Sequence, residues 1–409
     1  MLYVDTHLRR ALELLPELPD TSRRIHHELG LLFQLRVQLG RLKGEAASEL
    51  KAVVERIQEL SQHVEPTPEL FWAFTGVYLF YLIRGELRTA EVLAQQRVQL
   101  VHRFPSPLFA MAAYAEVGIA TFFLGEPMTA HEHFQRAIEH YDPHAPHPFF
   151  FDWEHGPPCF CYAAFVSWQL GYINKAQELI RQALTRSRAL RLPYMEAFAS
   201  NCAALLAALC GQGESLHQQA TAAIIIAETH EFSGMVKMAK IYLGWMHAQN
   251  GHREEAIQQM EQSMKAYQIG GGDAFRAAHL ALYADACGGM GNTEAGLAAV
   301  DNALVLTQRT GGRYYEAELY RIKGELLLNA ERGMQNDERQ TIKKRRSSSS
   351  IYHLSFIVHR SAEVDAEACF HKAIEIARHQ QAKSWELRAT MSLARLRQQQ
   401  ATRNVSRNT

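Results

Sequence analysis

Apolar and polar positions along this chain repeat with a period of about 40 residues, a length typical of proteins built from internal repeats. In residues 170–184, Gly171 is followed by Ala176, Ile180 and Ala183, with polar residues between them. The same order of a glycine and then small and large apolar residues begins at other points, namely Gly85, Gly125, Gly251 and Gly291. The interval from Gly85 to Gly125 recurs from Gly211 to Gly251 and from Gly251 to Gly291. This constancy indicates a true internal repeat.

A second set of small residues lies seven positions before the turn of each unit. It comprises Gly118, Ala164, Ala204, Gly244, Ala284 and Gly324. A third set lies on the segment after the turn and comprises Ala137, Ala183, Ala223, Ser263 and Ala303. Small residues at fixed places let neighbouring helices approach closely, and Phe134, Ile180 and Met260 fill the space between them. Each unit is therefore predicted to be a helix, a glycine-centred turn and a helix, and stacked units bury a continuous core.

This pattern resembles the tetratricopeptide repeat, whose usual period is about 34 residues. The longer period here predicts helices that are nearly one turn longer than usual. We predict an all-α, right-handed superhelical solenoid of about eight helical hairpins. The predicted regions are an N-terminal edge helix at 1–24, repeats at 25–330, a disordered insertion at 331–361, the last repeat helix and a capping helix at 362–400, and a disordered tail at 401–409.

The predicted insertion is recognised by a break in the period. The interval from Ala303 to Ala373 is much longer than one period but shorter than two. Because loop closure depends only weakly on loop length, an insertion at the hairpin turn leaves both flanking helices in register. The sequence "KKRRSSSS" at 343–350 indicates a solvated, mobile loop, although a nucleic-acid patch, a localisation signal and a phosphorylation target are alternatives.

Three stretches show a narrower resemblance. Residues 71–96, 310–328 and 367–396 resemble the C-terminal repeat arm of large bacterial signalling ATPases, many of which carry an adenylate or guanylate cyclase domain. The resemblance implies a sensing role and a protein partner, an ATPase or cyclase module. The chain itself has no G-x-x-x-x-G-K-[ST] loop, so we expect no enzyme activity, no catalytic residue and no cofactor.

Composition limits the partners and the cellular location that we expect for the protein. Lys and Arg total 43, and Asp and Glu also total 43, so no net charge steers the chain toward nucleic acid or an anionic membrane. The N-terminal residues do not form a secretory signal, and six cysteines at irregular spacing are typical of a reduced protein. We therefore expect a cytoplasmic protein.

The segment 140–162 is the best candidate for a metal site. It contains potential zinc ligands at His144, His147, His155, Cys159 and Cys161. No pair has the spacing of a structural zinc site, so the alternative is an ordered linker between repeats, packed by aromatic residues. A metal hydrolase centred on 140–161 is accordingly the least favoured of the functions considered.

The first helices of tetratricopeptide arrays line an inner groove that binds partners. The matching positions here are Phe165, Trp168, Asn201, Trp245 and Asp285, for which packing between units is the alternative. The leading functional hypothesis is a non-enzymatic interaction scaffold, the sensing arm of a signalling ATPase or cyclase system. The alternative is a stand-alone regulator that binds a small effector in the concave groove.

The N-terminal segment suggests an incomplete hairpin. Residues 7–20 are predicted to form the second helix of a hairpin, with Leu8 and Leu12 on one face and Pro16 at its end. No partner first helix precedes Met1 in this sequence. We therefore expect an apolar N-terminal edge that docks on another polypeptide or drives self-association.

Overall fold

The chain is described by a computed structural model that places residues 2–19, 22–44, 46–104, 106–144, 154–251, 253–269, 272–344 and 350–408. Helices account for all the regular structure in these residues. The first nine are α1 Leu2–Leu14, α2 Ser22–Lys43, α3 Leu50–Ser61, α4 Pro68–Ile83, α5 Leu87–Leu100, α6 Pro107–Phe123, α7 Pro127–Glu139, α8 Gly156–Gln169 and α9 Ile173–Leu190. The others are α10 Pro193–Leu209, α11 Gly213–Thr229, α12 Ser233–Gln249, α13 Arg253–Ile269, α14 Arg276–Met290, α15 Thr293–Thr310, α16 Glu316–Lys344, α17 Ser350–His379 and α18 Lys383–Asn408. Two short 3₁₀ helices, Leu15–Glu17 and Val101–Arg103, follow α1 and α5.

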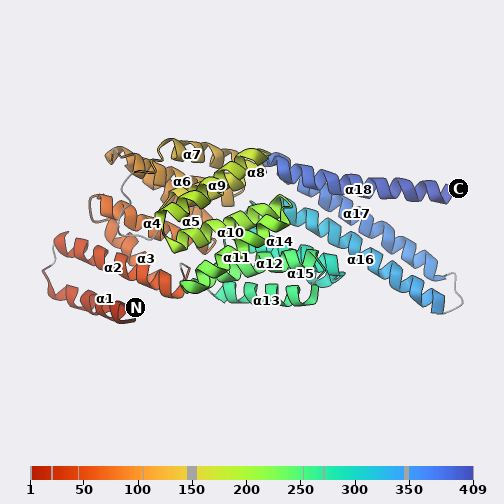
Figure 1. Ribbon diagram of the computed structural model, residues 1–409, viewed down its shortest axis with the longest axis horizontal. Coiled ribbons are helices and arrows are strands. Elements are labelled where there is room, and N and C mark those ends of the chain that lie inside the picture. The colour runs from red at the N-terminus through yellow and green to blue at the C-terminus, as the bar shows by residue number, and fades with distance from the viewer. Residues whose placement is uncertain are drawn as a thin grey trace.

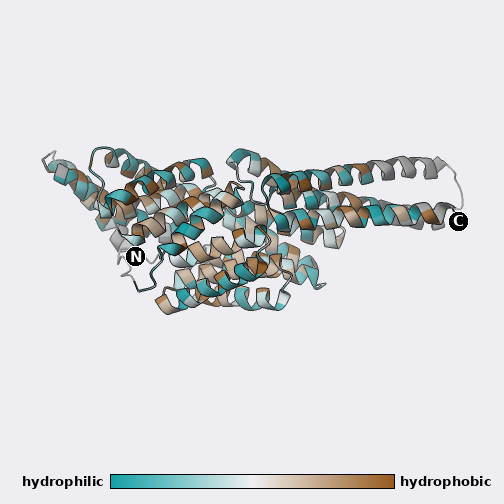
Figure 2. Ribbon diagram, turned by 90° about the horizontal axis from the view of Figure 1, so that it is seen from above, coloured by the Kyte–Doolittle hydropathy of each residue, from teal (hydrophilic) through white to brown (hydrophobic). Residues whose placement is uncertain are grey.

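Consecutive helices pair as hairpins, from α2–α3 to α16–α17, and α18 packs on the last of them. Among the described residues this makes eight hairpins and one closing helix. The first helices of neighbouring hairpins, α6 to α18, also contact one another in sequence and form an inner layer (Figure 1). In Figure 2 most helices alternate in colour along their length, as expected of helices with one buried face. The predicted all-α solenoid is confirmed.

The hairpin turns explain the glycine period. Each predicted turn glycine has a left-handed backbone conformation, with φ between 69° and 99° at Gly85, Gly125, Gly171, Gly211, Gly251 and Gly291. This conformation lets the amide of the next residue bond back into the helix, as Glu126 N does to Thr121 O at 3.0 Å. Glycine adopts it without the steric penalty of a Cβ atom. The period is thus a property of the turn as well as of the packing.

The small residues of the first helix receive large residues of the second. A Cβ atom on Gly118 would lie 2.8 Å from the Phe134 ring, and one on Gly324 would lie 2.5 Å from the Phe370 ring. The two phenylalanines thus occupy the same place in their hairpins, although a much longer stretch of chain separates Phe370 from its glycine. The extra residues therefore leave the packing register of the last hairpin unchanged, as predicted.

The extra residues themselves differ from the predicted loop. Helix α16 continues through the turn position, where Glu331 replaces the glycine, and α17 begins at Ser350, so that 331–344 and 350–361 belong to two long helices. Glutamate does not favour the left-handed conformation that glycine adopts at this position in the other hairpins, and the first helix does not end there. Residues 345–349, which hold most of the serine and basic run, lie outside the described residues.

The predicted disordered tail also differs, and for a similar reason. Ala401 stands at the turn position of α18, and the helix continues to Asn408. Arg403 bonds to Glu363 of α17, which joins this extension to the neighbouring helix. The region 401–408 is therefore helical.

The prediction of an apolar N-terminal edge fails at Leu8 and Leu12. Leu8 is buried in a cluster with leucines of α2, and Leu12 is partly buried against the same cluster. The predicted partner helix lies after α1 in the sequence, because α1 packs on the 22-residue α2. These two leucines are covered by their own chain, so they provide no basis for self-association.

The superhelix closes on itself after five hairpins. The amide of Asp273, before α14, donates to Ile83 O at the end of α4 at 2.8 Å, and Arg313 N donates to Phe123 O of α6 at 2.9 Å. In the same way Ser384 of α18 donates to Trp168 O of α8. Later hairpins thus donate to carbonyl groups at the ends of earlier helices, and Trp168 O also accepts from Gly171 N of its own turn. We call the region from α4 to α15 the body.

Aromatic rings fill the space between the two turns of the superhelix. The Phe123 ring centroid lies 5.1 Å from Tyr314, 5.3 Å from Phe275 and 5.6 Å from Tyr162. These rings come from α6, α8 and the residues that precede α14 and α16. Aromatic pairs at these separations stabilise beyond their buried area. None of the described helices is both long and apolar enough to cross a membrane.

Candidate functional site

One column of residues on the first helices changes character along the chain. It lies six positions before the turn position of each hairpin and comprises Leu79, Ile119, Phe165, Leu205, Trp245, Asp285 and Glu325. The first four are buried apolar side chains of α4 to α10. The last three lie on α12, α14 and α16 and are partly exposed. At these seven positions, the accessible side chains lie on the later helices α12, α14 and α16.

The centre of this surface is a hydrogen-bonded group on α12 and α14. The indole Nε1 of Trp245 donates to Asp285 Oδ2 at 2.9 Å, and Gln249 Nε2 donates to the same oxygen at 2.9 Å. Trp245 and Gln249 are one helical turn apart, so both reach one carboxylate on the next first helix. An indole, an amide and a carboxylate are thereby held together on the surface. We call these three side chains the Trp245–Asp285 group.

A buried ionic network lies next to this surface and joins α16 to α18. Arg321 donates to both Glu318 oxygens, at 2.8 and 2.9 Å, and Arg388 of α18 donates to Glu318 Oε1 at 2.7 Å. Burial alone would raise the pKa of the Glu318 carboxyl, but the two guanidinium groups outweigh it and hold the pKa below its ordinary value. Glu318 is therefore ionised and joins α16 to α18.

The structure brings together two of the five predicted groove residues. Trp245 and Asp285 are bonded to each other at the surface, whereas Phe165, Trp168 and Asn201 are buried. Asn201 Nδ2 donates to Met235 O at 3.2 Å and so joins α10 to the start of α12. The alternative, packing between units, describes these three residues.

Gln249 is a site residue that the sequence interpretation missed. It lies one turn after Trp245, on the side of α12 that faces α14. The sequence signal for Gln249 was its position one helical turn after Trp245. Residues four positions apart share a face of a helix, so both side chains face the next first helix.

The candidate zinc ligands do not converge. Cys159 and Cys161 are fully buried in α8, and burial raises the pKa of both thiols. His155 is buried beside Glu116, His144 is exposed, and His147 lies outside the described residues. Among the residues that the structure places, no group of three or more potential ligands could hold a metal ion.

His155 instead belongs to a buried ionic cluster. Its Nε2 lies 3.4 Å from Glu116 Oε1, and Glu116 also pairs with Arg97, whose guanidinium lies 4.1 Å from the centre of the Phe71 ring. Burial would raise the pKa of the Glu116 carboxyl, but Arg97 and His155 together hold it below its ordinary value. The cluster joins α5, α6 and the start of α8, and its side chains are almost inaccessible, so we interpret it as structural.

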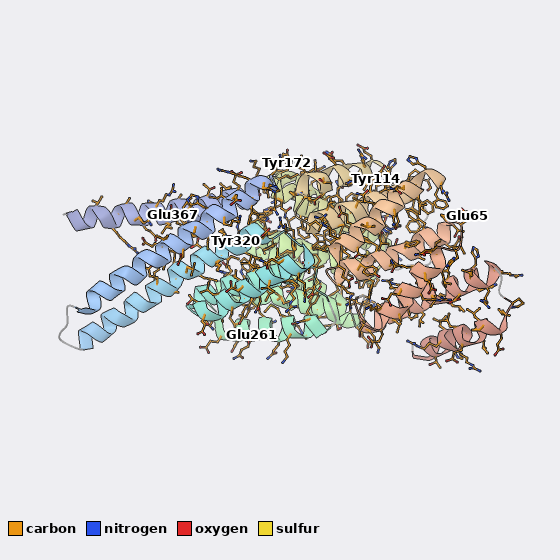
Figure 3. The ribbon with its side chains drawn as sticks, turned by 180° about the vertical axis from the view of Figure 1, so that it is seen from behind. Glu65, Tyr114, Tyr172, Glu261, Tyr320 and Glu367 are labelled. Carbon is orange, nitrogen blue, oxygen red and sulfur yellow. The ribbon has the colours of Figure 1, made fainter. Side chains whose placement is uncertain are left out.

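A pocket lies on the outer side of the later hairpins. A cavity of about 380 Å³ separates α13 from α15, with α14 as its floor. His279 at its base is buried, which lowers its pKa to about 3, so the imidazole is neutral and shares a hydrogen bond with Tyr242. Glu261, labelled in Figure 3, bonds to Tyr283 at its edge. The lining includes Lys265, Arg276, Leu280, Ala295, Ala299 and Asn302.

Comparison with known proteins identifies the architecture. No protein-family model and no curated protein matches this sequence. Among solved structures, the chain is similar to a Rap protein complexed with Competence and Sporulation Factor, with 13% identity, a TM-score of 0.52, and coverage of 92% of this chain and 99% of that one. It is also similar to NprR in complex with its cognate peptide NprX, with 11% identity, a TM-score of 0.50, and coverage of 88% and 100%. At such identities the likeness shows the fold alone. The chain is an all-helical repeat protein with a tetratricopeptide-like solenoid.

Proposed function

We propose that this protein is a non-catalytic regulator that binds a polypeptide segment on the exposed inner surface of α12, α14 and α16. The observation that carries the proposal is the change along the first-helix column. Where the column is buried, its residues are apolar, and where it is exposed, Trp245, Asp285 and Glu325 replace them. An exposed surface of this kind is the part of the inner layer that a partner can reach.

The chemistry of the Trp245–Asp285 group suits a peptide. Trp245 supplies a large amphipathic ring, a type of residue that often dominates binding energy at interfaces. Asp285 and Gln249 supply acceptors and donors for a peptide backbone or a basic side chain. Because Asp285 is already held by two donors, little side-chain entropy is lost when it binds.

The likeness to NprR supports a peptide rather than a metabolite as the ligand, since that protein is described in complex with its cognate peptide. The proposal thus follows the alternative of a stand-alone regulator, with a peptide as the effector. The ATPase or cyclase module implied by the sequence resemblance gains no support from the comparisons and stays a prediction.

The test uses a phage-displayed library of random peptides selected against the whole chain. Selected peptides are then measured by fluorescence anisotropy against Trp245→Ala and Asp285→Asn. We expect each substitution to weaken binding by at least about tenfold. The control is Glu255→Gln on α13, an exposed acidic residue on the outer side, which should leave affinity unchanged.

Circular dichroism and thermal unfolding establish that the variants are folded. Selection of no peptide above background would overturn the proposed function. Peptides that bind wild type and both variants equally would show that the Trp245–Asp285 group is not the site.

A further inference from the structure

Helix α18 carries a regular apolar stripe on its solvent side. The stripe consists of Leu387, Met391, Ala394, Ala401 and Val405, with the polar Gln398 between Ala394 and Ala401, at alternating spacings of four and three positions. All six are exposed, with Leu387 61% and Val405 66% accessible. This is the spacing of the a and d positions that join helices in coiled coils. At the rise of an α-helix, the stripe is about 27 Å long.

The equivalent residues of earlier hairpins show which kind of element covers this face. In earlier hairpins the small residue of the first helix is covered by the second helix, as Gly118 is by Phe134 and Gly324 by Phe370. The equivalent residue of α18 is Ala394, which follows Gly324 by the same lengthened interval that separates Ala303 from Ala373. Ala394 is exposed. In α18 the face that receives a second helix is therefore open among the described residues.

A separate position on the body leads to the same conclusion. Two residues after the turn glycine, Leu87 and Pro127 are buried, and the turn glycines Gly85 and Gly125 lie close to Asp273 before α14 and Arg313 before α16. The equivalent Ile173 is 37% exposed, and Tyr172 beside it is 58% exposed. Lys383 at the start of α18 reaches Gly171, but α18 leaves these two side chains uncovered. Figure 3 shows Tyr172 where α18 meets the body.

Charge indicates the chemistry of the occupant. Helix α18 has six basic residues and one acidic residue, Glu386. Arg388, Arg397 and Arg403 pair with glutamates of α16 and α17, away from the stripe. Arg395 lies beside the stripe and is exposed, with no ion pair found among the described residues. A second copy of α18 would bring like charges together, whereas a helix with acidic flanks would pair with Arg395.

We propose that the α18 stripe, together with Tyr172 and Ile173, is a docking site for an acidic amphipathic helix of a partner protein. The helix would take the place of the second helix of a ninth hairpin, with its apolar residues against Leu387, Met391 and Ala394. This site lies apart from the Trp245–Asp285 group, so it does not depend on the proposed peptide-binding function.

The probe is a synthetic helical peptide of about three heptads, with leucine at a and d and glutamate at the flanking positions. We expect saturable binding to the whole chain in fluorescence anisotropy. The double variant Leu387→Glu/Met391→Glu should weaken binding by at least about tenfold. The control Val305→Glu changes an equally exposed apolar residue of α15, which is 64% accessible, and should leave binding unchanged.

A second peptide with lysine in place of the flanking glutamates tests the charge argument, and it should bind at least about tenfold more weakly. Equal binding of the two peptides, no loss in the double variant, or no saturation below about 1 mM would each overturn the proposal. Sedimentation of the chain alone tests whether a second copy of the chain occupies the α18 stripe. A dimer that the double variant abolishes would make a second copy the occupant, and would also overturn it.

Discussion

The body and the C-terminal arm of this solenoid are built from the same repeat but are stabilised by different contacts. We define the arm as α16, α17 and α18, whose distal parts project from the body in Figure 1. Each hairpin of an open solenoid contacts only its neighbours. In the body, the ends of α4, α6 and α8 are also bonded to residues five hairpins later.

The arm has a smaller core and more ionic contacts. Phe370, Leu393 and Leu396 are buried in a separate apolar cluster, and ion pairs such as Arg397–Glu367 line its outer side. Exposed ion pairs contribute little to stability. Closure of the superhelix, rather than the repeat itself, therefore distinguishes a cooperative body from an arm that can open locally.

The largest loss of stability is expected when the contact that closes the superhelix is removed. Trp385 is 1% exposed, and its ring lies 4.5 Å from Trp168 of α8 and 5.0 Å from Tyr315. Trp385→Ala should lower the free energy of unfolding by about 3–5 kcal/mol. Urea unfolding measures this, with Val364→Ala, an exposed arm residue, as the control that changes stability by less than about 0.5 kcal/mol. A loss below about 1 kcal/mol for Trp385→Ala would mean that closure contributes little.

The next effect concerns the buried ionic cluster of the body. Glu116→Gln leaves the buried Arg97 guanidinium without its carboxylate and should cost about 3 kcal/mol or more. The pKa of Glu116 is below its ordinary value of 4.5 in the folded protein, so its contribution is complete above that pH and is lost as the pH falls through the folded pKa. The stabilities of wild type and variant should therefore converge in acid. A gap that persists unchanged to the lowest pH would contradict this account.

A smaller effect is expected at the hairpin that joins body and arm. Gly324→Ala places a Cβ atom 2.5 Å from the Phe370 ring and should cost about 1–3 kcal/mol, despite the better helix propensity of alanine. Gly289→Ala on α14 is the matched control, because a Cβ there meets nothing within 4 Å, and it should stabilise by up to about 1 kcal/mol. Thermal unfolding of both variants checks the difference. Equal behaviour would show that the register assigned to α17 is wrong.

The smallest effect is expected in the arm. Arg403→Ala removes the pair with Glu363 on a partly exposed surface and should cost less than about 1 kcal/mol. Hydrogen exchange should show faster opening of the end of α18, while the body helices keep their protection, because the two regions open separately. Faster exchange throughout α4 to α15 would show that arm and body unfold as one unit.

The repeat was predictable because it depends on local geometry. A left-handed turn favours glycine, and close helix packing requires small residues, so both occur in the sequence at fixed intervals. The extended helices were not predicted, although the signal was present. Glu331 and Ala401 occupy turn positions where no glycine ends the helix. The serine and basic run at 343–350 indicates a loop, whereas the missing turn glycine favours a continuous helix.

The candidate site was only partly predictable. Column positions identified Trp245 and Asp285, but the same columns also selected Phe165 and Trp168, which are buried. Spacing shows that residues share a face of a helix, but it does not show which later segment covers that face. Five hairpins of sequence lie between Trp168 and the Ser384 hydroxyl that donates to its carbonyl.

The sequence by itself therefore determined the unit: a helix, a glycine turn and a helix, with a register that tolerates the longer interval between Ala303 and Ala373. Tertiary structure alone decided where the superhelix closes, which first helices stay exposed and that α1 covers its leucines with α2. The physical reason is distance along the chain. Turn geometry and helix packing act between residues a few positions to one repeat apart, whereas closure depends on small rotations that add up over five hairpins.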